Sequence, residues 1–292
     1  MEYPRLMTAM ITPFNAQYQV DSEKAKQMAR YLAENGSDGI VVCGTTGESP
    51  TLTSDEKLQL FQTVKDAVGG RVQIWAGIGS NATLSTVELA KKAAAIGVDG
   101  IMAVAPYYNK PTQDGLYLHF KSIADAVSIP LMMYNIPSRT SINMLPETVA
   151  RLAAIENITA LKESSGMMDQ TSMLKRLLPD DFMLYCGDDS LTLPMMALGA
   201  HGVVSVASHL IGKPMAEMIQ RFTAGDTKRA LELHLQLFDV FKVLFITTSP
   251  ILLKEALRLK GMDTGLLRPP LCAPNEKEKQ ELETVLRSQQ LI

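Results

Sequence analysis

Residues 72–105 read VQIWAGIGSNATLSTVELAKKAAAIGVDGIMAVA, and the fold follows from the order of the patterns within them. The apolar run Val72–Gly77 predicts a β-strand, and Gly100–Ala105 predicts a second one. Between the two runs, apolar residues recur three or four positions apart, which is typical of a helix with one buried face. Gly97 follows that stretch, and glycine is the residue type that most often ends a helix. The stretch therefore predicts a strand, a helix and a second strand in succession.

The same alternation of strand and helix recurs along most of the chain. Eight apolar runs predict strands at Leu6–Thr12, Gly39–Cys43, Val72–Gly77, Gly100–Ala105, Leu131–Tyr134, Thr159–Lys162, Met183–Cys186 and Val203–Val206. Alternating strands and helices indicate a parallel sheet, and runs this continuously apolar indicate strands buried on both faces. Eight units in roughly 225 residues favour a closed (β/α)8 barrel, a fold of the α/β class. An open, doubly wound sheet is the alternative.

The pattern changes near Gly225, where the predicted strands stop. Three segments of helical periodicity follow: Lys228–Phe245, Ile251–Lys260 and Glu276–Arg287. The last of them begins with Asn275 and Glu278, which are spaced to form a capping box. We therefore expect a barrel domain at residues 1–224 and a helical domain at residues 225–292. The helical domain is expected to cover the barrel or to form an oligomer interface.

The composition argues against several classes of protein. Of the 292 residues 46% are hydrophobic and the net charge is only -3, which excludes a disordered chain. No run of basic residues could follow a phosphate backbone, so nucleic-acid binding is not expected. No apolar stretch is long enough to span a bilayer and the N-terminus lacks the pattern of a signal peptide, so no membrane partner is expected. Three cysteines without a C-x-x-C pair fit a reducing cytoplasm and predict no metal site.

One motif suggests a nucleotide cofactor. Gly77–Ala82 matches G-x-G-x-x-A, and Asp99 lies about twenty residues further on. The motif falls in the third strand–helix unit rather than the first, and no predicted strand directly precedes Asp99. We therefore predict no nucleotide cofactor.

The chemistry is expected where the strands end, because a (β/α)8 barrel carries its active site at the carboxyl ends of its strands. Lys162 ends the sixth apolar run and is expected to point into the mouth of the barrel. Desolvation there favours the neutral amine, which can attack a ketone and form a Schiff base. A strand-end lysine that pairs with Glu163 is the alternative.

Other polar residues follow neighbouring strands. Tyr134 ends the fifth run and could carry protons for such an amine. Thr45 and Thr46 lie between glycines, and their backbone N–H groups could hold a carboxylate. Arg139 could hold a carboxylate through two parallel hydrogen bonds. The structural alternatives are a core-edge tyrosine, an ordinary strand-to-helix turn and a solvated loop arginine.

Four motifs occur in a characteristic order: Gly44–Ser49, Pro106–Asn109, Tyr134–Thr140 and Leu161–Glu163. Together they closely resemble the dihydrodipicolinate synthase family of the pyruvate-dependent class I aldolase superfamily, and the resemblance covers essentially the whole chain. It implies a (β/α)8 barrel with a C-terminal helical domain, assembled as a homotetramer (a dimer of dimers). It also implies condensation of pyruvate with the aldehyde L-aspartate 4-semialdehyde, in lysine and diaminopimelate biosynthesis, without a metal or an organic cofactor.

The resemblance implies catalytic roles for residues at the strand ends. Lys162 would form the Schiff base with pyruvate. Thr46, together with the backbone of Thr45, would hold the pyruvate carboxylate. Tyr134 would pass protons during imine formation and cyclisation. The hydroxyls of Thr45 and Tyr108 would extend that relay, with Tyr108 reaching across from a neighbouring subunit.

The resemblance also implies substrate-binding roles. Arg139 would recruit the carboxylate of the aldehyde, and the backbone at Gly187 and Val204 would line the pocket near the lysine. Thr45–Thr46 and Arg139 favour the synthases over the N-acetylneuraminate lyases and over other pyruvate aldolases or hydratases, such as 2-keto-3-deoxy-sugar-acid aldolases. A non-catalytic sensor of keto acids or amino acids is a further alternative, and the retained proton relay argues against it.

The chain departs from the family pattern in two places. Lysine-inhibited members tend to carry His or Lys where Ser54 stands, His where Lys57 stands and Glu where Ser85 stands. Because that glutamate would neutralise the ammonium of bound lysine, we expect weak inhibition by L-lysine or none. The synthases typically have Asn-Pro-Ile-Pro where this chain has Ser249–Leu252, and we expect this change to concern domain packing.

Overall fold

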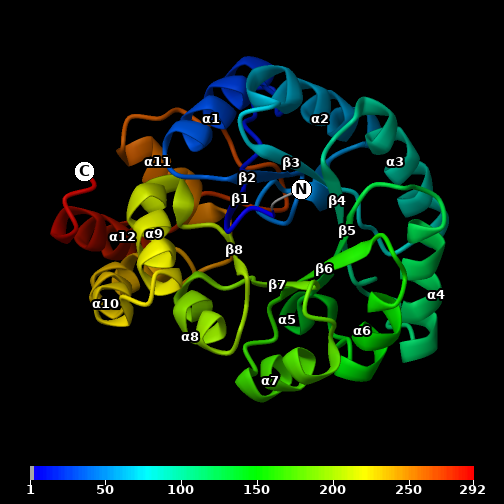
Figure 1. The fold of residues 1–292 in the computed structure, drawn as a ribbon. Coiled ribbons are helices and arrows are strands. Elements are labelled where there is room, and N and C mark those ends of the chain that lie inside the picture. The colour runs from blue at the N-terminus through cyan, green and yellow to red at the C-terminus, as the bar shows by residue number, and fades with distance from the viewer. Residues whose placement is uncertain (1–2) are drawn as a thin grey trace.

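The computed structural model describes residues 3–292 and has a closed barrel of eight parallel strands (Figure 1). Each strand pairs with the next along the chain, and β8 closes the barrel by pairing with β1. The strands are β1 (Leu6–Ala9), β2 (Gly39–Val42), β3 (Gln73–Gly77), β4 (Gly100–Val104), β5 (Leu131–Asn135), β6 (Ile158–Glu163), β7 (Met183–Cys186) and β8 (Gly202–Ser205). The prediction of a (β/α)8 barrel is confirmed, and the alternative of an open sheet is wrong.

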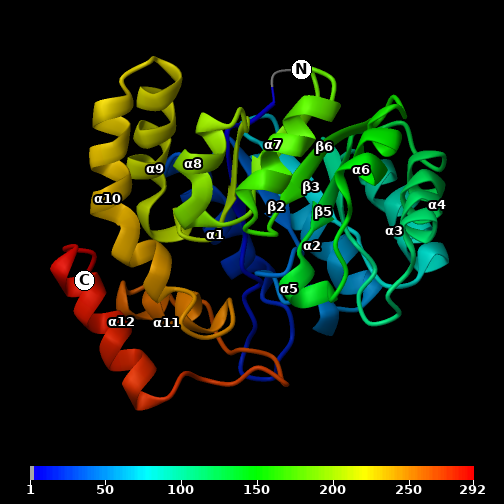
Figure 2. The same ribbon diagram turned by 90° about the horizontal axis from the view of Figure 1, so that it is seen from below.

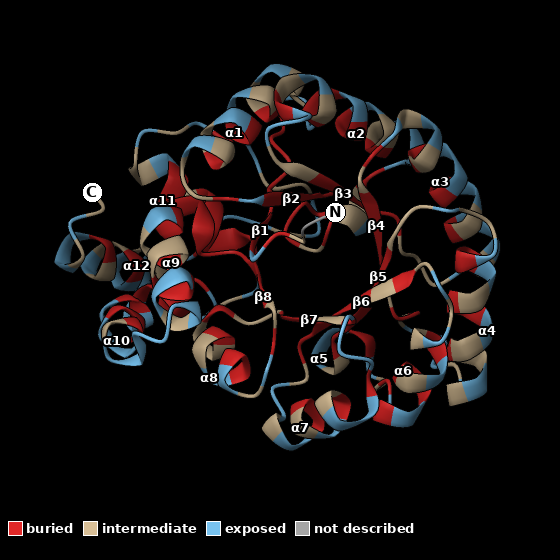
Figure 3. Ribbon diagram, in the orientation of Figure 1, coloured by how far each residue is buried: buried red, intermediate tan, exposed pale blue. Residues whose placement is uncertain are grey.

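Helices form the outer ring around the strands (Figure 1). The short helix α5 (Pro137–Thr140) is not part of this ring and lies directly after β5 at the mouth of the barrel (Figure 2). The ring consists of α1 (Ser22–Glu34), α2 (Ser54–Val68), α3 (Thr83–Ile96), α4 (Gln113–Ala124), α6 (Pro146–Ala153), α7 (Met168–Leu177), α8 (Thr192–Ala197) and α9 (Ser208–Thr223). Figure 3 shows that buried residues gather on their barrel-facing sides and exposed residues on their outer sides. Local signals set their ends: a capping box of Thr53 and Glu56 begins α2, and Gly97, with φ of 79°, ends α3 as predicted. Among residues 3–292, no helix has the length and apolar character needed to cross a bilayer.

Large side chains fill the interior of the barrel. They come from alternate positions of the strands and form one cluster that includes Met7, Val41, Trp75, Met132, Tyr185 and Val204. The interior is therefore a packed core rather than a pore, as in other barrels of this kind. A packed interior leaves the mouth, where the strands end, as the place where a ligand can bind.

The first strand is shorter than the sequence predicts. The apolar run Leu6–Thr12 predicts a strand as far as Thr12, but β1 ends at Ala9. The Thr12 hydroxyl donates a hydrogen bond of 2.7 Å to the backbone oxygen of Gly47, in the turn after the neighbouring strand β2. Thr12, at the end of the apolar run, therefore stabilises the turn after β2 and is not part of the sheet. The other seven strands agree with their predicted bounds to within one residue.

Three helices follow the barrel: α10 (Thr227–Val243), α11 (Ile251–Leu259) and α12 (Glu276–Ser288). Helix α10 packs against α9, and α11 packs against α12. Asn275 and Glu278 form the predicted capping box at the start of α12. Figure 2 shows α11 and the chain that follows it on the same side of the barrel as α5, which comes directly after β5. The C-terminal helices thus extend beside the mouth of the barrel.

Candidate active site

Lys162 lies near the end of β6, with its side chain in the mouth of the barrel. The strand register places it beside Tyr134 of β5 on one side and Tyr185 of β7 on the other. The residue is 5% exposed, and its Nζ lies 4.1 Å from the centroid of the Tyr134 ring. Within residues 3–292 no carboxylate forms an ion pair with it. The site therefore holds a buried amine without a counter-ion.

Glu163 points to the opposite face of β6, because successive side chains of a strand alternate in direction. Its Oε2 accepts hydrogen bonds from Asn135 Nδ2 (3.0 Å) and Gln170 Nε2 (3.1 Å). Its Oε1 accepts one from the backbone N–H of Ser165 (2.6 Å). The carboxylate is thus held outside the barrel interior, and the alternative in which Lys162 pairs with Glu163 is wrong.

The turn after β2 offers two free backbone N–H groups. In the part of the chain that the structure describes, neither the N–H of Thr45 nor that of Thr46 has an acceptor. The next three N–H groups donate back to the carbonyl oxygens of Gly44 and Thr45, which fixes the turn. Thr46 is buried and Thr45 is half-buried. Two adjacent free N–H groups in a rigid turn suit the oxygens of an anion such as a carboxylate.

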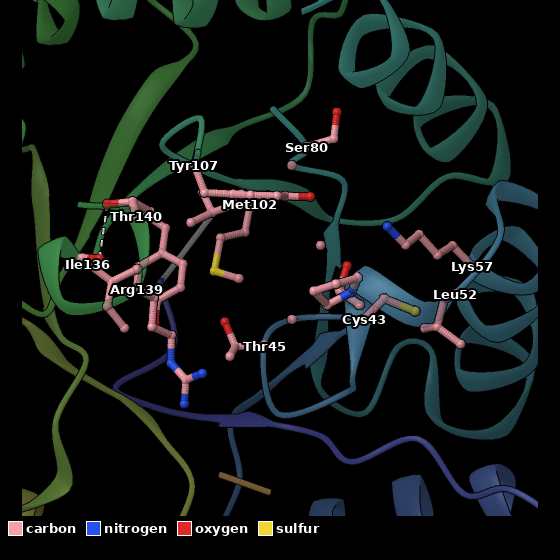
Figure 4. A pocket seen from close by; sticks show the side chains of 17 residues that line it. Cys43, Thr45, Leu52, Lys57, Ser80, Met102, Tyr107, Ile136, Arg139 and Thr140 are labelled. Carbon is pink, nitrogen blue, oxygen red and sulfur yellow. Dashed lines mark hydrogen bonds between the residues drawn. The ribbon is translucent and has the colours of Figure 1, made fainter. Parts of the chain in front are cut away.

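A cavity of about 410 Å³ adjoins this turn (Figure 4). Thr45, Tyr134 and Arg139 line it, so three of the predicted site residues meet there. Its charged side chains are Arg139 and Lys57, which lie on opposite sides of it in Figure 4. No aspartate or glutamate of the described chain lines it. The cavity therefore favours an anionic ligand.

Most of the other lining residues were not predicted as site residues, among them Lys57, Met102 and Tyr107. Lys57 is 8% exposed and has no ion-pair partner among residues 3–292; burial lowers the pKa of its ammonium group. Met102 belongs to the inward-facing cluster of the barrel, so the alternation of side chains along β4 could have indicated it. The position of Lys57 on α2 carries no such signal.

Arg139 lies on the short helix α5 at the edge of the cavity. Its side chain is exposed, and no carboxylate of the described chain pairs with it. Its Nη2 donates a hydrogen bond of 3.3 Å to Thr248 Oγ1, in the segment that precedes α11. The guanidinium is thus oriented by the C-terminal segment and retains donors for a carboxylate ligand.

The remaining predicted residues lie in different surroundings. Gly187 adjoins the lysine: a Cβ at this position would overlap Ser164 Oγ and would lie 3.0 Å from Lys162 Cε. Val204 is fully buried inside the barrel. Tyr108 is 89% exposed, has a left-handed backbone with φ of 74°, and does not line the cavity. Within the single chain, Tyr108 is therefore not part of the site.

Asp189, after β7, and Asp99, of the apparent nucleotide motif, both have structural partners. Asp189 Oδ2 accepts hydrogen bonds from the N–H groups of Val206 (3.1 Å) and Ala207 (2.9 Å) and so fixes the loop after β8. Asp99 Oδ2 accepts one from the N–H of Ile74 (2.8 Å). The aspartate of the apparent nucleotide motif is thus bound to the neighbouring strand. Among the residues described, no group of three or more His, Cys, Asp or Glu side chains is arranged to hold a metal ion.

A buried lysine without a counter-ion, beside a tyrosine in the mouth of a (β/α)8 barrel, defines a site of the imine-forming class of enzymes. Comparison with known proteins gives the particular family. The chain belongs to the dihydrodipicolinate synthetase family, whose family model matches residues 2–289.

Relatives and solved structures agree with this assignment over the whole chain. The 4-hydroxy-tetrahydrodipicolinate synthase of Desulforudis audaxviator is 52% identical, covering 100% of this chain and 99% of the relative. The synthase of the same description from Thermosynechococcus vestitus is 54% identical, covering 98% and 97%. The crystal structure of dihydrodipicolinate synthase from Cyanidioschyzon merolae with lysine bound has a TM-score of 0.97 at 46% identity, covering 99% of this chain and 98% of that one.

Proposed function

We propose that the protein condenses pyruvate with L-aspartate 4-semialdehyde to 4-hydroxy-tetrahydrodipicolinate, in lysine and diaminopimelate biosynthesis. The observation that carries the proposal is the buried Lys162 amine, which has no counter-ion in the described chain and lies against Tyr134. A lysine in that setting is a nucleophile for a keto acid. Membership of the synthetase family over nearly the full chain supports the choice of substrates.

The reaction proceeds through an imine on Lys162. The amine adds to the C2 carbonyl carbon of pyruvate, and the adduct loses water. Loss of a proton from the pyruvate methyl group then gives an enamine, whose terminal carbon forms a bond to the aldehyde carbon of the second substrate. The amino group of that substrate attacks the imine carbon, closes the ring and expels the Lys162 amine.

Pyruvate is held by its carboxylate at the turn after β2. The free N–H groups of Thr45 and Thr46 donate to the carboxylate, and the Thr46 side chain adds to this contact. Gly187 and Val204 do not line the cavity described above; in this proposal their backbone borders pyruvate on the side of Lys162, where the missing side chain of Gly187 leaves room. The absence of acidic side chains from the cavity lining, among the described residues, supports the binding of anionic substrates.

The protons move through hydroxyl groups. Tyr134, which adjoins Lys162, exchanges them with the substrate, and Thr45 and Tyr108 extend the relay. Tyr108 acts in a neighbouring subunit of a homotetramer, in which two dimers associate. Its 89% exposure in the single chain supports this role, because a relay residue has to be covered by a partner.

Arg139 binds the carboxylate of the aldehyde and distinguishes this reaction from those of other pyruvate aldolases. Its lack of an ion-pair partner in the described chain and its place at the edge of the cavity support that role.

We also place the protein in the cytoplasm, because Cys43, Cys186 and Cys272 are all free. We also propose a division into a catalytic barrel (1–224) and a helical domain (225–292), which the family resemblance implies.

The experiment that tests the proposal measures pyruvate consumption by the purified protein with and without L-aspartate 4-semialdehyde. Consumption that depends on the semialdehyde is the expected result. A parallel treatment with pyruvate and borohydride should attach pyruvate covalently to Lys162, and a Lys162→Ala variant should remain unlabelled. Labelling without consumption would point to another aldehyde acceptor, and the absence of labelling would overturn the proposal.

A further inference from the structure

Glu48, two residues after Thr46, forms a buried ion pair with the C-terminal part of the chain. Its Oε1 lies 2.6 Å from Nζ of Lys254, which belongs to α11. The two side chains are 0% and 4% exposed. A buried ion pair therefore joins the turn after β2 to a helix that comes about two hundred residues later in the sequence.

Arg268 binds the same turn from the segment after α11. Its backbone N–H donates to Glu48 Oε2 (2.9 Å), and its Nη1 donates to the backbone oxygen of Thr51 (2.7 Å). Its Nη2 pairs with Glu56 Oε1 at 2.7 Å, in the first turn of α2. Arg268 of the C-terminal segment thus contacts the turn after β2 at Glu48 and Thr51, and it contacts the start of α2 at Glu56.

Phe14 completes the contact on the barrel side. Lys254 Nζ lies 4.6 Å from the centroid of its ring, and the Arg268 guanidinium carbon lies 4.3 Å from it. The N–H of Phe14 donates to the carbonyl oxygen of Thr264, in the C-terminal segment. Lys254 Nζ also donates to the carbonyl oxygen of Leu266 (2.8 Å), so its position is fixed from both sides.

The backbone of Glu48 indicates that this position is constrained. Its φ is 56°, in the left-handed region where glycine is the favoured residue. Such a conformation persists where the surroundings enforce it, and it is concentrated near functional sites. Replacing a buried ion pair by apolar residues is often neutral for stability, so stability alone is a weak reason for this one.

We propose that Glu48 and Lys254 are positioning residues for the pyruvate carboxylate. Their ion pair holds the turn so that the N–H groups of Thr45 and Thr46 stay free and point at the substrate. Glu48 itself does not line the cavity, so it acts through the turn rather than by contact. This inference rests on the proposed function, in which those two N–H groups bind pyruvate.

The test compares Lys254→Met and Glu48→Gln with the wild type, in the full-length protein. The borohydride-trapping rate, measured as a function of pyruvate concentration without any aldehyde, gives the half-saturating pyruvate concentration. We expect both variants to raise it at least tenfold and to leave the limiting trapping rate within about threefold. Half-saturation for the aldehyde should change less, because neither Glu48 nor Lys254 contacts Arg139, whose hydrogen-bond partner is Thr248. A general loss of structure would instead lower every rate together.

Lys24→Met is the matched control. Lys24 Nζ pairs with Asp263 Oδ2 at 2.6 Å and also joins the barrel to the C-terminal segment, but this pair is partly exposed and neither residue contacts the turn after β2. We expect this variant to bind pyruvate as the wild type does. If the single variants fail to fold, the double variant Glu48→Gln/Lys254→Met buries no unpaired charge and should fold with the same weakened pyruvate binding.

The outcomes distinguish a failure of the proposed function from a failure of the positioning role of Glu48 and Lys254. If the wild type traps no pyruvate, the proposed function itself fails. If the wild type traps pyruvate and folded Lys254→Met saturates at the same concentration, the positioning role is overturned. Failure of both the single and the double variants to fold would also overturn it, because the pair would then be a determinant of folding alone.

Discussion

Nζ of Lys162 lies 4.1 Å from the centre of the Tyr134 ring, and the two residues are direct neighbours in the register of β6 and β5. The contact covers the amine with an aromatic face while no carboxylate of the described chain pairs with it. The hydroxyl of Tyr134 is attached to the same ring that covers the amine. The tyrosine thus both shields the Lys162 amine and brings a hydroxyl group near it.

Tyr134→Phe keeps the ring against Lys162 and removes only the hydroxyl. We expect the turnover number to fall by about 100-fold, the usual loss when a general acid–base is removed. Borohydride trapping of pyruvate should slow but still label Lys162. Tyr185→Phe is the control on the other side of the lysine: it loses a hydrogen bond to the Pro4 carbonyl oxygen and should lower stability without slowing trapping. Equal effects of the two variants on trapping would contradict the role of Tyr134.

Arg139→Ala should impair use of the aldehyde and leave imine formation with pyruvate intact. The loss of charged hydrogen bonds to a carboxylate predicts a rise in the half-saturating aldehyde concentration of roughly 10- to 100-fold. Steady-state kinetics and borohydride trapping separate the two substrates. Arg151→Ala, which removes an exposed pair with Asp114, serves as a control without effect on either. An equal loss for both substrates would refute this role of Arg139.

Tyr108→Phe should lower turnover while the fold stays intact. The residue is 89% exposed in the single chain, so we expect removal of its hydroxyl to leave the stability of the isolated subunit nearly unchanged. If it completes the relay of a neighbouring subunit, we expect a fall in turnover of about tenfold or more. Turnover and thermal unfolding are measured together, with Tyr18→Phe as an exposed control. Unchanged turnover would exclude Tyr108 from the relay.

L-Lysine should inhibit the protein weakly or not at all. The cavity is lined by the cationic side chains of Lys57 and Arg139, and no acidic side chain of the described chain lines it. An ammonium group entering it would meet like charge without a compensating carboxylate. Initial rates with increasing L-lysine test this, with the 46% identical lysine-bound Cyanidioschyzon merolae protein as comparison. Strong inhibition at sub-millimolar lysine would contradict the expectation.

Stability should fall on acidification because His209 is buried in its neutral form. Its Nδ1 lies 2.9 Å from the Val206 carbonyl oxygen, and its Nε2 accepts a hydrogen bond from the N–H of Ile11 (3.3 Å). Burial lowers the pKa of His209 to about 4, from an ordinary value of 6.5. Between those values the unfolded chain binds a proton that the folded chain does not. The contribution is therefore complete above pH 6.5 and is lost toward pH 4, by about 3 kcal/mol.

Urea unfolding at pH 7 and at pH 4.5 measures this effect. His209→Gln lacks the titrating group, so its free energy of unfolding should fall less between the two pH values than that of the wild type. The variant is compared with itself across pH, which removes any constant loss of stability. Parallel decreases in the two proteins would show that His209 does not contribute.

The sequence by itself determined the succession of strands and helices. The spacing of apolar residues reveals both element types, because the direction of successive side chains is set by local backbone geometry. It also predicted where Lys162 and Tyr134 lie, since both end apolar runs and parallel strands bring their carboxyl ends together. Even the opposite direction of Glu163 follows from alternation along a strand, although its partners Asn135 and Gln170 do not. The early end of β1 was not predicted, because a hydroxyl contact with Gly47 depends on another loop.

Only the tertiary structure decided which charges meet. Nothing in the sequence near Glu48 indicates Lys254 as its partner, and nothing near Lys57 indicates a cavity shared with Arg139. Such pairings depend on how the closed barrel and the C-terminal helices bring together residues that are far apart in the chain. Whether a buried charged side chain has an ion-pair partner, as Glu48 does, or none, as with Lys57, depends on that arrangement, so these contacts are fixed by the complete fold and not by any local pattern.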